Sequence, residues 1–90
     1  MNKHLKITIS GEVQGVGFRM HARSVAHDLS ICGFIKNQPD ETVFIEAEGS
    51  NHQLLQFTNW CRTGPAHATV EDVSIEETSW VGFKSFEIRR

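Results

Sequence analysis

Residues 4–29 read HLKITISGEVQGVGFRMHARSVAHDL and contain three successive patterns. Over 4–10, leucine and isoleucine alternate with polar residues, which is the period of a half-buried strand. A stretch rich in glycine follows over 11–17. From Phe18 onward, apolar residues recur with the spacing of an amphipathic helix that runs to about Ser30. The sequence therefore predicts a strand, a tight loop and a helix in direct succession.

The rest of the chain contains further strand and helix signals. Pro39 followed by Asp40 is a turn signal between two segments rich in β-forming residues. Ser50 and Gln53 fit a capping box at the start of a helix. We expect a hairpin of strands over 31–37 and 42–48, a helix over about 51–63, a strand over 69–77 and a last strand beyond the turn at 79–82.

This order of elements predicts an α+β fold with a ferredoxin-like βαββαβ sandwich. Right-handed crossovers would place both helices on one face of an antiparallel sheet, with a short extra strand or an extended final one. The 90 residues fall just under the usual size of one domain, so we expect residues 1–90 to form a single domain.

Composition narrows the classes of function. The formal net charge is −2, so no overall basic field would attract nucleic acid or anionic lipid. No long apolar run or signal-peptide cleavage site is apparent, which makes a cytoplasmic protein without a membrane partner the expectation. Cys32 and Cys61 are too few for a disulfide framework and lack zinc-site spacing, so we predict two reduced, buried thiols.

The glycine-rich loop has the composition of an anion site. Glycines permit positive φ, so successive N–H groups can turn toward one centre, and the following helix N-terminus adds a favourable dipole. Arg19 lies in the first helical turn, where the helix dipole disfavours a cation. Its guanidinium could grip two oxygens of a phosphate or sulfate. The alternative is a tight connection with a solvated arginine.

Four segments, GEVQGVGFR, GFIKNQPD, EAEG and FEIR, together resemble the acylphosphatases over nearly the whole chain. The resemblance implies a small hydrolase, without metal or cofactor, that cleaves acyl phosphates to a carboxylate and inorganic phosphate. It places the catalytic arginine on Arg19 and the water-orienting asparagine on Asn37. The expected phosphate-binding residues are Gln14, Gly15, Val16, Gly17, Phe18 and Arg19.

Elementary chemistry agrees with that implication. A carboxylate leaving group has a conjugate acid of pKa about 4, so it departs without a general acid. Charge on the phosphoryl oxygens can be stabilised by an arginine and N–H groups without a metal. A carboxamide such as that of Asn37 can hold a water in line, although on its own it would more commonly be a turn residue. Whether a phosphate oxygen takes the proton is left open.

Two departures from the family pattern affect the hairpin. Glu41 stands where the family usually has glycine, and a positive φ there would cost about 1 kcal/mol, so the turn could be remodelled. Phe34 stands where tryptophan is common, and we expect the packing to adjust.

Other polar side chains are weaker candidates for the site. His21, His27 and Arg23 are expected to be surface residues of the first helix. Glu46 and Glu48 are weak candidates for a carboxylate pair and are expected to form a polar strand face.

Two other classes of protein are alternatives to an acyl phosphate hydrolase. An RNA-recognition module shares the order of elements but requires a basic aromatic strand, whereas TVFIEAE is acidic. A regulatory domain would bind phosphate in the loop and leave acyl phosphates intact. We expect a monomer that binds acyl phosphate, phosphate or sulfate and no nucleic acid.

Overall fold

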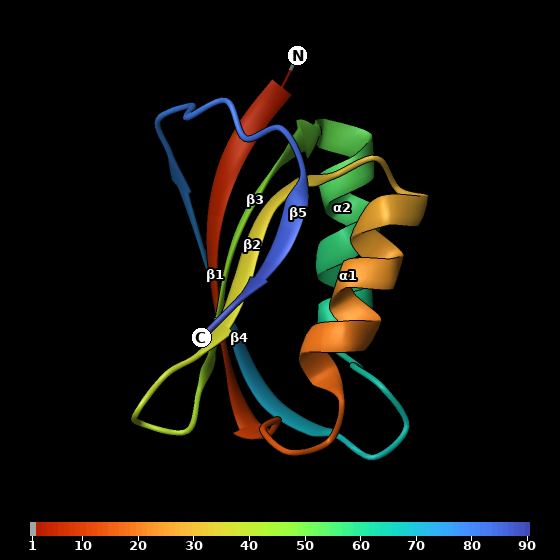
Figure 1. The fold of residues 1–90 in the computed structure, drawn as a ribbon, viewed down its shortest axis with the longest axis vertical. Coiled ribbons are helices and arrows are strands. Elements are labelled where there is room, and N and C mark those ends of the chain that lie inside the picture. The colour runs from red at the N-terminus through yellow and green to blue at the C-terminus, as the bar shows by residue number, and fades with distance from the viewer. Residues whose placement is uncertain (1) are drawn as a thin grey trace.

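A computed structural model describes residues 2–90 and shows two helices packed against one sheet (Figure 1). Its elements, in chain order, are β1 (Asn2–Glu12), α1 (Phe18–Asp28), β2 (Cys32–Asn37), β3 (Val43–Ser50), α2 (Asn51–Cys61), β4 (Thr69–Thr78) and β5 (Phe86–Arg89).

The sheet has five strands in the order β4-β1-β3-β2-β5, and both helices cover the same face of it (Figure 1). This confirms the ferredoxin-like α+β fold and the extra strand. One pair differs from the expected antiparallel sheet, because β5 runs parallel to β2. Strands β4 and β5 lie at opposite edges, so residues 79–85 carry the chain from one edge to the other before β5 begins.

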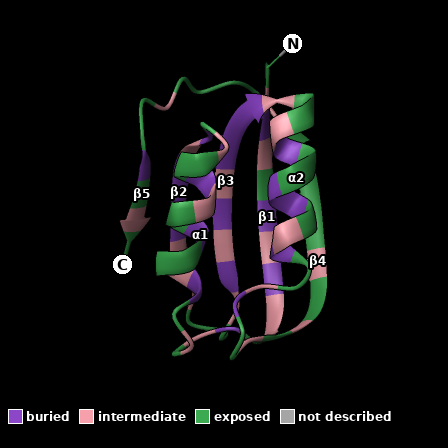
Figure 2. Cartoon of the chain, turned by 90° about the vertical axis from the view of Figure 1, so that its right-hand side faces the viewer, coloured by how far each residue is buried: buried purple, intermediate pink, exposed green. Residues whose placement is uncertain are grey.

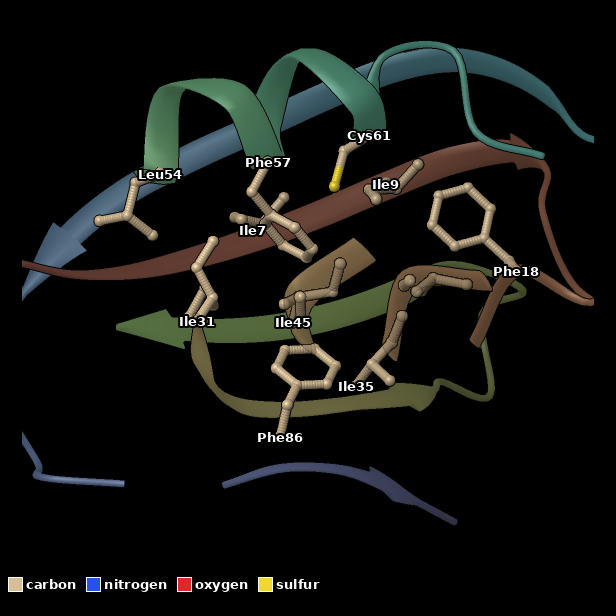
Figure 3. Close-up of a cluster of buried hydrophobic side chains, with 14 of the residues drawn as sticks. Ile7, Ile9, Phe18, Ile31, Ile35, Ile45, Leu54, Phe57, Cys61 and Phe86 are labelled. Carbon is tan, nitrogen blue, oxygen red and sulfur yellow. The ribbon is translucent and has the colours of Figure 1, made fainter. Parts of the chain in front are cut away.

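The core lies between the helices and the sheet (Figures 2 and 3). In β1, Ile7 and Ile9 are fully buried, as the alternating pattern predicts. In α1, Phe18 and Ala22 are buried, and Phe18 packs edge-on against Trp60 of α2 with ring centroids 5.3 Å apart. Burial of these side chains fixes α1 against the sheet and thereby fixes the position of its N-terminus.

Local hydrogen bonds explain where helix α2 begins and where it ends. The predicted capping box is present: the N–H of Gln53 donates to the Ser50 hydroxyl, and the Ser50 N–H donates to the Gln53 side chain. Helix α2 ends at Cys61, and the N–H of Gly64, at φ 69°, donates to the Trp60 carbonyl. Helix α1 stops at Asp28, slightly before the predicted end, and Ser30 adopts φ 59°.

The two cysteines are free thiols, but only one of them is in the core. Cys61 is fully buried, and burial raises the pKa of its thiol to about 12. Cys32 is only partly buried, so the expectation of two buried cysteines is wrong for this residue, which lies at the start of β2.

Over residues 2–90, neither helix has the length and apolar character needed to cross a bilayer.

Candidate active site

The loop between β1 and α1 depends on two glycines in the left-handed region. Gly15 has φ 73° and Gly17 has φ 78°, values that residues with a Cβ rarely adopt. A Cβ built on Gly15 would have no protein atom within 4 Å, so this residue faces open space. The chain can therefore turn sharply between the end of β1 and the start of α1 while its backbone stays accessible.

The N-terminus of α1 carries no internal counter-charge. Its N-cap is Gly17, no side chain caps it, and its first turn contains no acidic residue. The unpaired N–H groups of that turn and the helix dipole both favour an anion. Arg19 adds a full positive charge in the same turn, which makes this end of the helix strongly electropositive.

A hollow of about 130 Å³ lies at this helix end. It brings Arg19 of α1 together with Asn37, the last residue of β2, which is 18 positions away along the chain. Both are partly buried. The residues that line it are Val13, Gly15, Gly17, Phe18, Arg19, Met20 and Asn37.

Most of the predicted site residues therefore line one space, but two do not. Val16 packs against the core. The side chain of Gln14 turns to the β2–β3 hairpin, where its Nε2 donates to the carbonyls of Gln38 at 2.9 Å and Thr42 at 2.8 Å. Any contact of Gln14 with a bound anion is thus left to its backbone. Val13 and Met20 line the hollow without having been expected there.

The hairpin that carries Asn37 has a well-bonded turn. The Gln38 N–H donates to the Thr42 carbonyl at 2.9 Å. Asp40 accepts from the Thr42 hydroxyl at 2.6 Å and from its N–H at 3.1 Å. The hydroxyl bond and then the N–H bond lower the pKa of Asp40. Asp40, rather than Asn37, thus provides the side-chain bond that is typical of such turns.

Glu41 keeps the turn in the shape that usually requires glycine. Its φ is 72°, so the hairpin is not remodelled and the chain accepts the strain. Phe34 packs between Phe44 and Phe83 on the open face of the sheet, with ring centroids 6.0 and 5.8 Å away.

The remaining candidates lie outside the hollow. His21 is exposed, and its Nδ1 bonds the Gly17 carbonyl at 2.8 Å. Glu48 is buried, contrary to the expectation of an exposed polar face, and its carboxylate lies 2.6 Å from His4 Nδ1.

Among residues 2–90, no group of three or more His, Cys, Asp or Glu side chains is placed to hold a metal ion.

Glu48 has several hydrogen-bond donors. It accepts from the N–H groups of Val81 at 2.6 Å, Gly82 at 3.0 Å and Phe83 at 2.8 Å, in addition to its contact with His4. Burial raises the pKa of Glu48, but the bonds to His4 and to these amides outweigh burial and lower the pKa overall. The carboxylate therefore holds the segment that leads to β5.

Comparison with known proteins places the chain in a narrow group. The family model described as Acylphosphatase matches residues 5–88. An acylphosphatase of Thermotoga maritima is 46% identical over 87 residues, which is 97% of each chain. The crystal structure of an acylphosphatase from Bacillus subtilis has a TM-score of 0.95 at 34% identity and covers all of both chains. An acylphosphatase from Coxiella burnetii has a TM-score of 0.95 at 33% identity, covering 98% of this chain and 93% of that one.

Proposed function

The chain belongs to the acylphosphatase family and is an acyl phosphate hydrolase, and we propose that the hollow at the N-terminus of α1 is its active site. In this proposal the phosphoryl group lies against the loop of Gly15–Gly17 and the first turn of α1. The observation that carries it is that Arg19 and Asn37 line the same small hollow as the two left-handed glycines.

Arg19 and the backbone amides bind the phosphate. A planar guanidinium can donate two parallel hydrogen bonds to phosphate oxygens, and the helix N-terminus offers further N–H donors. The hollow of about 130 Å³ has room for a phosphate and a water but not for a large ligand. These donors stabilise the charge that spreads over the equatorial oxygens in the transition state.

Asn37 orients the attacking water from the opposite element. Its carboxamide oxygen accepts one hydrogen bond from the water and so directs a lone pair of the water oxygen at phosphorus. The new P–O bond forms as the bond between phosphorus and the acyl oxygen breaks. The acyl oxygen leaves with the electron pair as a carboxylate, and the water proton passes to a phosphate oxygen.

The reaction requires neither a general acid nor a metal ion. The leaving carboxylate is a weak base, so it does not need a proton as it departs. The guanidinium and the amides supply the positive charge that a divalent cation supplies in other phosphoryl-transfer sites.

Incubation of the protein with benzoyl phosphate, with and without EDTA, tests this proposal. We expect release of benzoate and phosphate at equal rates in both samples. Glycerol phosphate, whose alkoxide leaving group needs an acid, should remain intact. Phosphate binding without turnover would instead support the anion-binding regulatory domain, and inhibition by EDTA would contradict the metal-free mechanism.

We further propose that residues 1–90 act as one domain and as a monomer in the cytoplasm, with no nucleic-acid partner. The net charge of −2 supports the last point, because it gives the protein no general attraction to polyanions.

A further inference from the structure

A second and larger hollow adjoins the proposed phosphate site. It has a volume of about 590 Å³ and is lined by Arg19, Met20, Ile88 and Arg90. Arg19 and Met20 also line the phosphate hollow, so the two spaces share a wall. A molecule bound through its phosphoryl group at Arg19 would extend its remaining atoms into this second space.

Strand β5 forms one side of this hollow, because its side chains alternate between the two faces of the sheet. Phe86 of β5 is buried in the core, Ile88 packs against the core's edge, and α1 contacts this strand. Arg90 directly follows the end of β5 and lines this hollow together with Ile88. Arg89 is directed to the other face, where its guanidinium stacks on Phe34 at 4.0 Å.

The lining combines positive charge with apolar surface. Met20 leaves 64% of its surface exposed although it lies beside the phosphate hollow, and Ile88 is partly buried. Arg90 is exposed, and within residues 2–90 no carboxylate of another residue lies within ion-pair distance of it. Neither glutamate nor aspartate lines this hollow.

We propose that this second hollow is the acyl subsite and that it favours acyl phosphates whose acyl chain ends in a second carboxylate. This inference rests on the proposed function, because it requires the phosphoryl group to lie at Arg19. The methylene groups of the acyl chain contact Met20 and Ile88, and the far carboxylate pairs with Arg90. Arg19 is occupied by the phosphate, which leaves Arg90 as the cation for the second anionic group.

A comparison of acetyl phosphate with succinyl phosphate tests the subsite. Acetyl phosphate has no second carboxylate, so the ratio of kcat/KM for succinyl over acetyl phosphate isolates the contribution of the acyl chain. We expect a ratio above one at low ionic strength that falls as salt is added. Arg90→Gln should lower the ratio about threefold, the range of a partly exposed ion pair.

Arg89→Gln is the matched control, because it removes the same charge one position away on the opposite face. The ratio should stay unchanged in this variant. An equal fall of the ratio in both variants would show a general effect of net charge and overturn the subsite. A ratio of one or less in the unaltered protein would also overturn it.

The two proposals can fail separately. If neither acetyl nor succinyl phosphate is hydrolysed, the proposed function is wrong. If acetyl phosphate is hydrolysed normally and the ratio does not respond to Arg90→Gln, the proposed function stands and only the acyl subsite is wrong.

Discussion

In the proposed mechanism, Arg19 and Asn37 have different roles although they line the same hollow. Arg19 is charged and lies in the first turn of α1, so within that proposal it acts on the phosphate before and during the reaction. Asn37 is neutral and comes from the end of β2, so it contributes little to anion binding. Substitution of each residue should therefore affect binding and turnover differently.

Asn37→Ala should lower kcat about 100-fold or more, because the attacking water is no longer held in line with phosphorus. The inhibition constant for inorganic phosphate should stay within about threefold, since the carboxamide serves the water rather than the bound anion. Steady-state kinetics with benzoyl phosphate, with phosphate as inhibitor, provide both values. Asn59→Ala, at an exposed position of α2, is the control and should behave as the unaltered protein. Turnover close to normal in Asn37→Ala would show that Asn37 is only a turn residue.

At the scale of elements, the side chain of Gln14 links the loop between β1 and α1 to the β2–β3 hairpin. Gln14 in the loop donates to two carbonyls of the hairpin, those of Gln38 and Thr42. The hairpin carries Asn37 directly before this contact. We infer that Gln14 is a positioning residue that sets the distance between the anion site and the water site.

Gln14→Leu should cost about 1–2 kcal/mol of stability through the two lost hydrogen bonds. It should also lower kcat about tenfold with little change in phosphate inhibition, because Asn37 loses its fixed position relative to the loop. Urea unfolding and kinetics measure the two effects. Gln56→Ala removes a side-chain bond of α2 to His52, and it should leave both kcat and phosphate inhibition as they are. A Gln14→Leu enzyme that is less stable but has normal kcat would limit Gln14 to a structural role.

The hairpin tip stores strain at Glu41, whose φ is 72°. Glu41→Gly should relieve that strain and raise the free energy of unfolding by about 1 kcal/mol. For a domain of this size the gain corresponds to a rise of about 4–8 °C in Tm. Glu41→Ala removes the charge but keeps the Cβ, so it should give no comparable gain. Equal stabilisation by alanine would attribute the effect to charge rather than to backbone strain.

At the scale of the whole molecule, a buried carboxylate anchors the segment between β4 and β5 to the sheet. Glu48 of β3 accepts hydrogen bonds from the backbone of residues 81–83, which lie between β4 and β5. It also contacts His4 of β1, and the other ring nitrogen of His4 lies 2.8 Å from Glu46. This network fixes residues 81–83, which lie in the segment that crosses to the opposite edge of the sheet.

The lowered pKa of Glu48 predicts how stability depends on pH. A depressed folded-state pKa means that the stabilisation is complete above the ordinary value of 4.5 and is lost as the pH falls through the lower folded value. Glu48→Gln should cost about 3–5 kcal/mol at pH 7, because it removes the charge from a buried network. Its deficit relative to the unaltered protein should shrink as the pH is lowered from 5 toward 3.

Urea unfolding at several pH values measures this deficit. Glu77→Gln, at an exposed position with a 3.7 Å contact to Lys3, is the control and should cost less than about 1 kcal/mol at every pH. A deficit of Glu48→Gln that stays constant down to pH 3 would mean that the carboxylate's charge does not contribute.

The sequence allowed the fold class, the two helices and most of the residues around the hollow to be predicted, for physical reasons. The local signals are the alternation of apolar and polar residues, the capping box at Ser50 and the glycines at 15 and 17. Each of them acts on the backbone within a few residues. Arg19 and Asn37 could be placed together only through the resemblance and the expected pairing of strands.

Three of the features that were missed depend on contacts between distant segments. Gln14 bonds main-chain carbonyls, which exist at every residue and leave no trace in the sequence. Glu48 follows the alternation of an outward-facing position, but it is buried and bonded by the backbone of residues 81–83. The parallel pairing of β5 with β2 follows from the same crossing, whose path no local pattern specifies.

Arg19→Gln in benzoyl phosphate hydrolysis, with inorganic phosphate as inhibitor, tests the central claim that the anion lies between the glycine loop and this guanidinium. We predict that kcat/KM falls about 1,000-fold and that inhibition by phosphate disappears in the same variant. Arg23→Gln, one turn further along α1, should keep both properties. An Arg19→Gln enzyme that phosphate still inhibits at its original concentration would contradict the claim, because the anion would then be bound elsewhere.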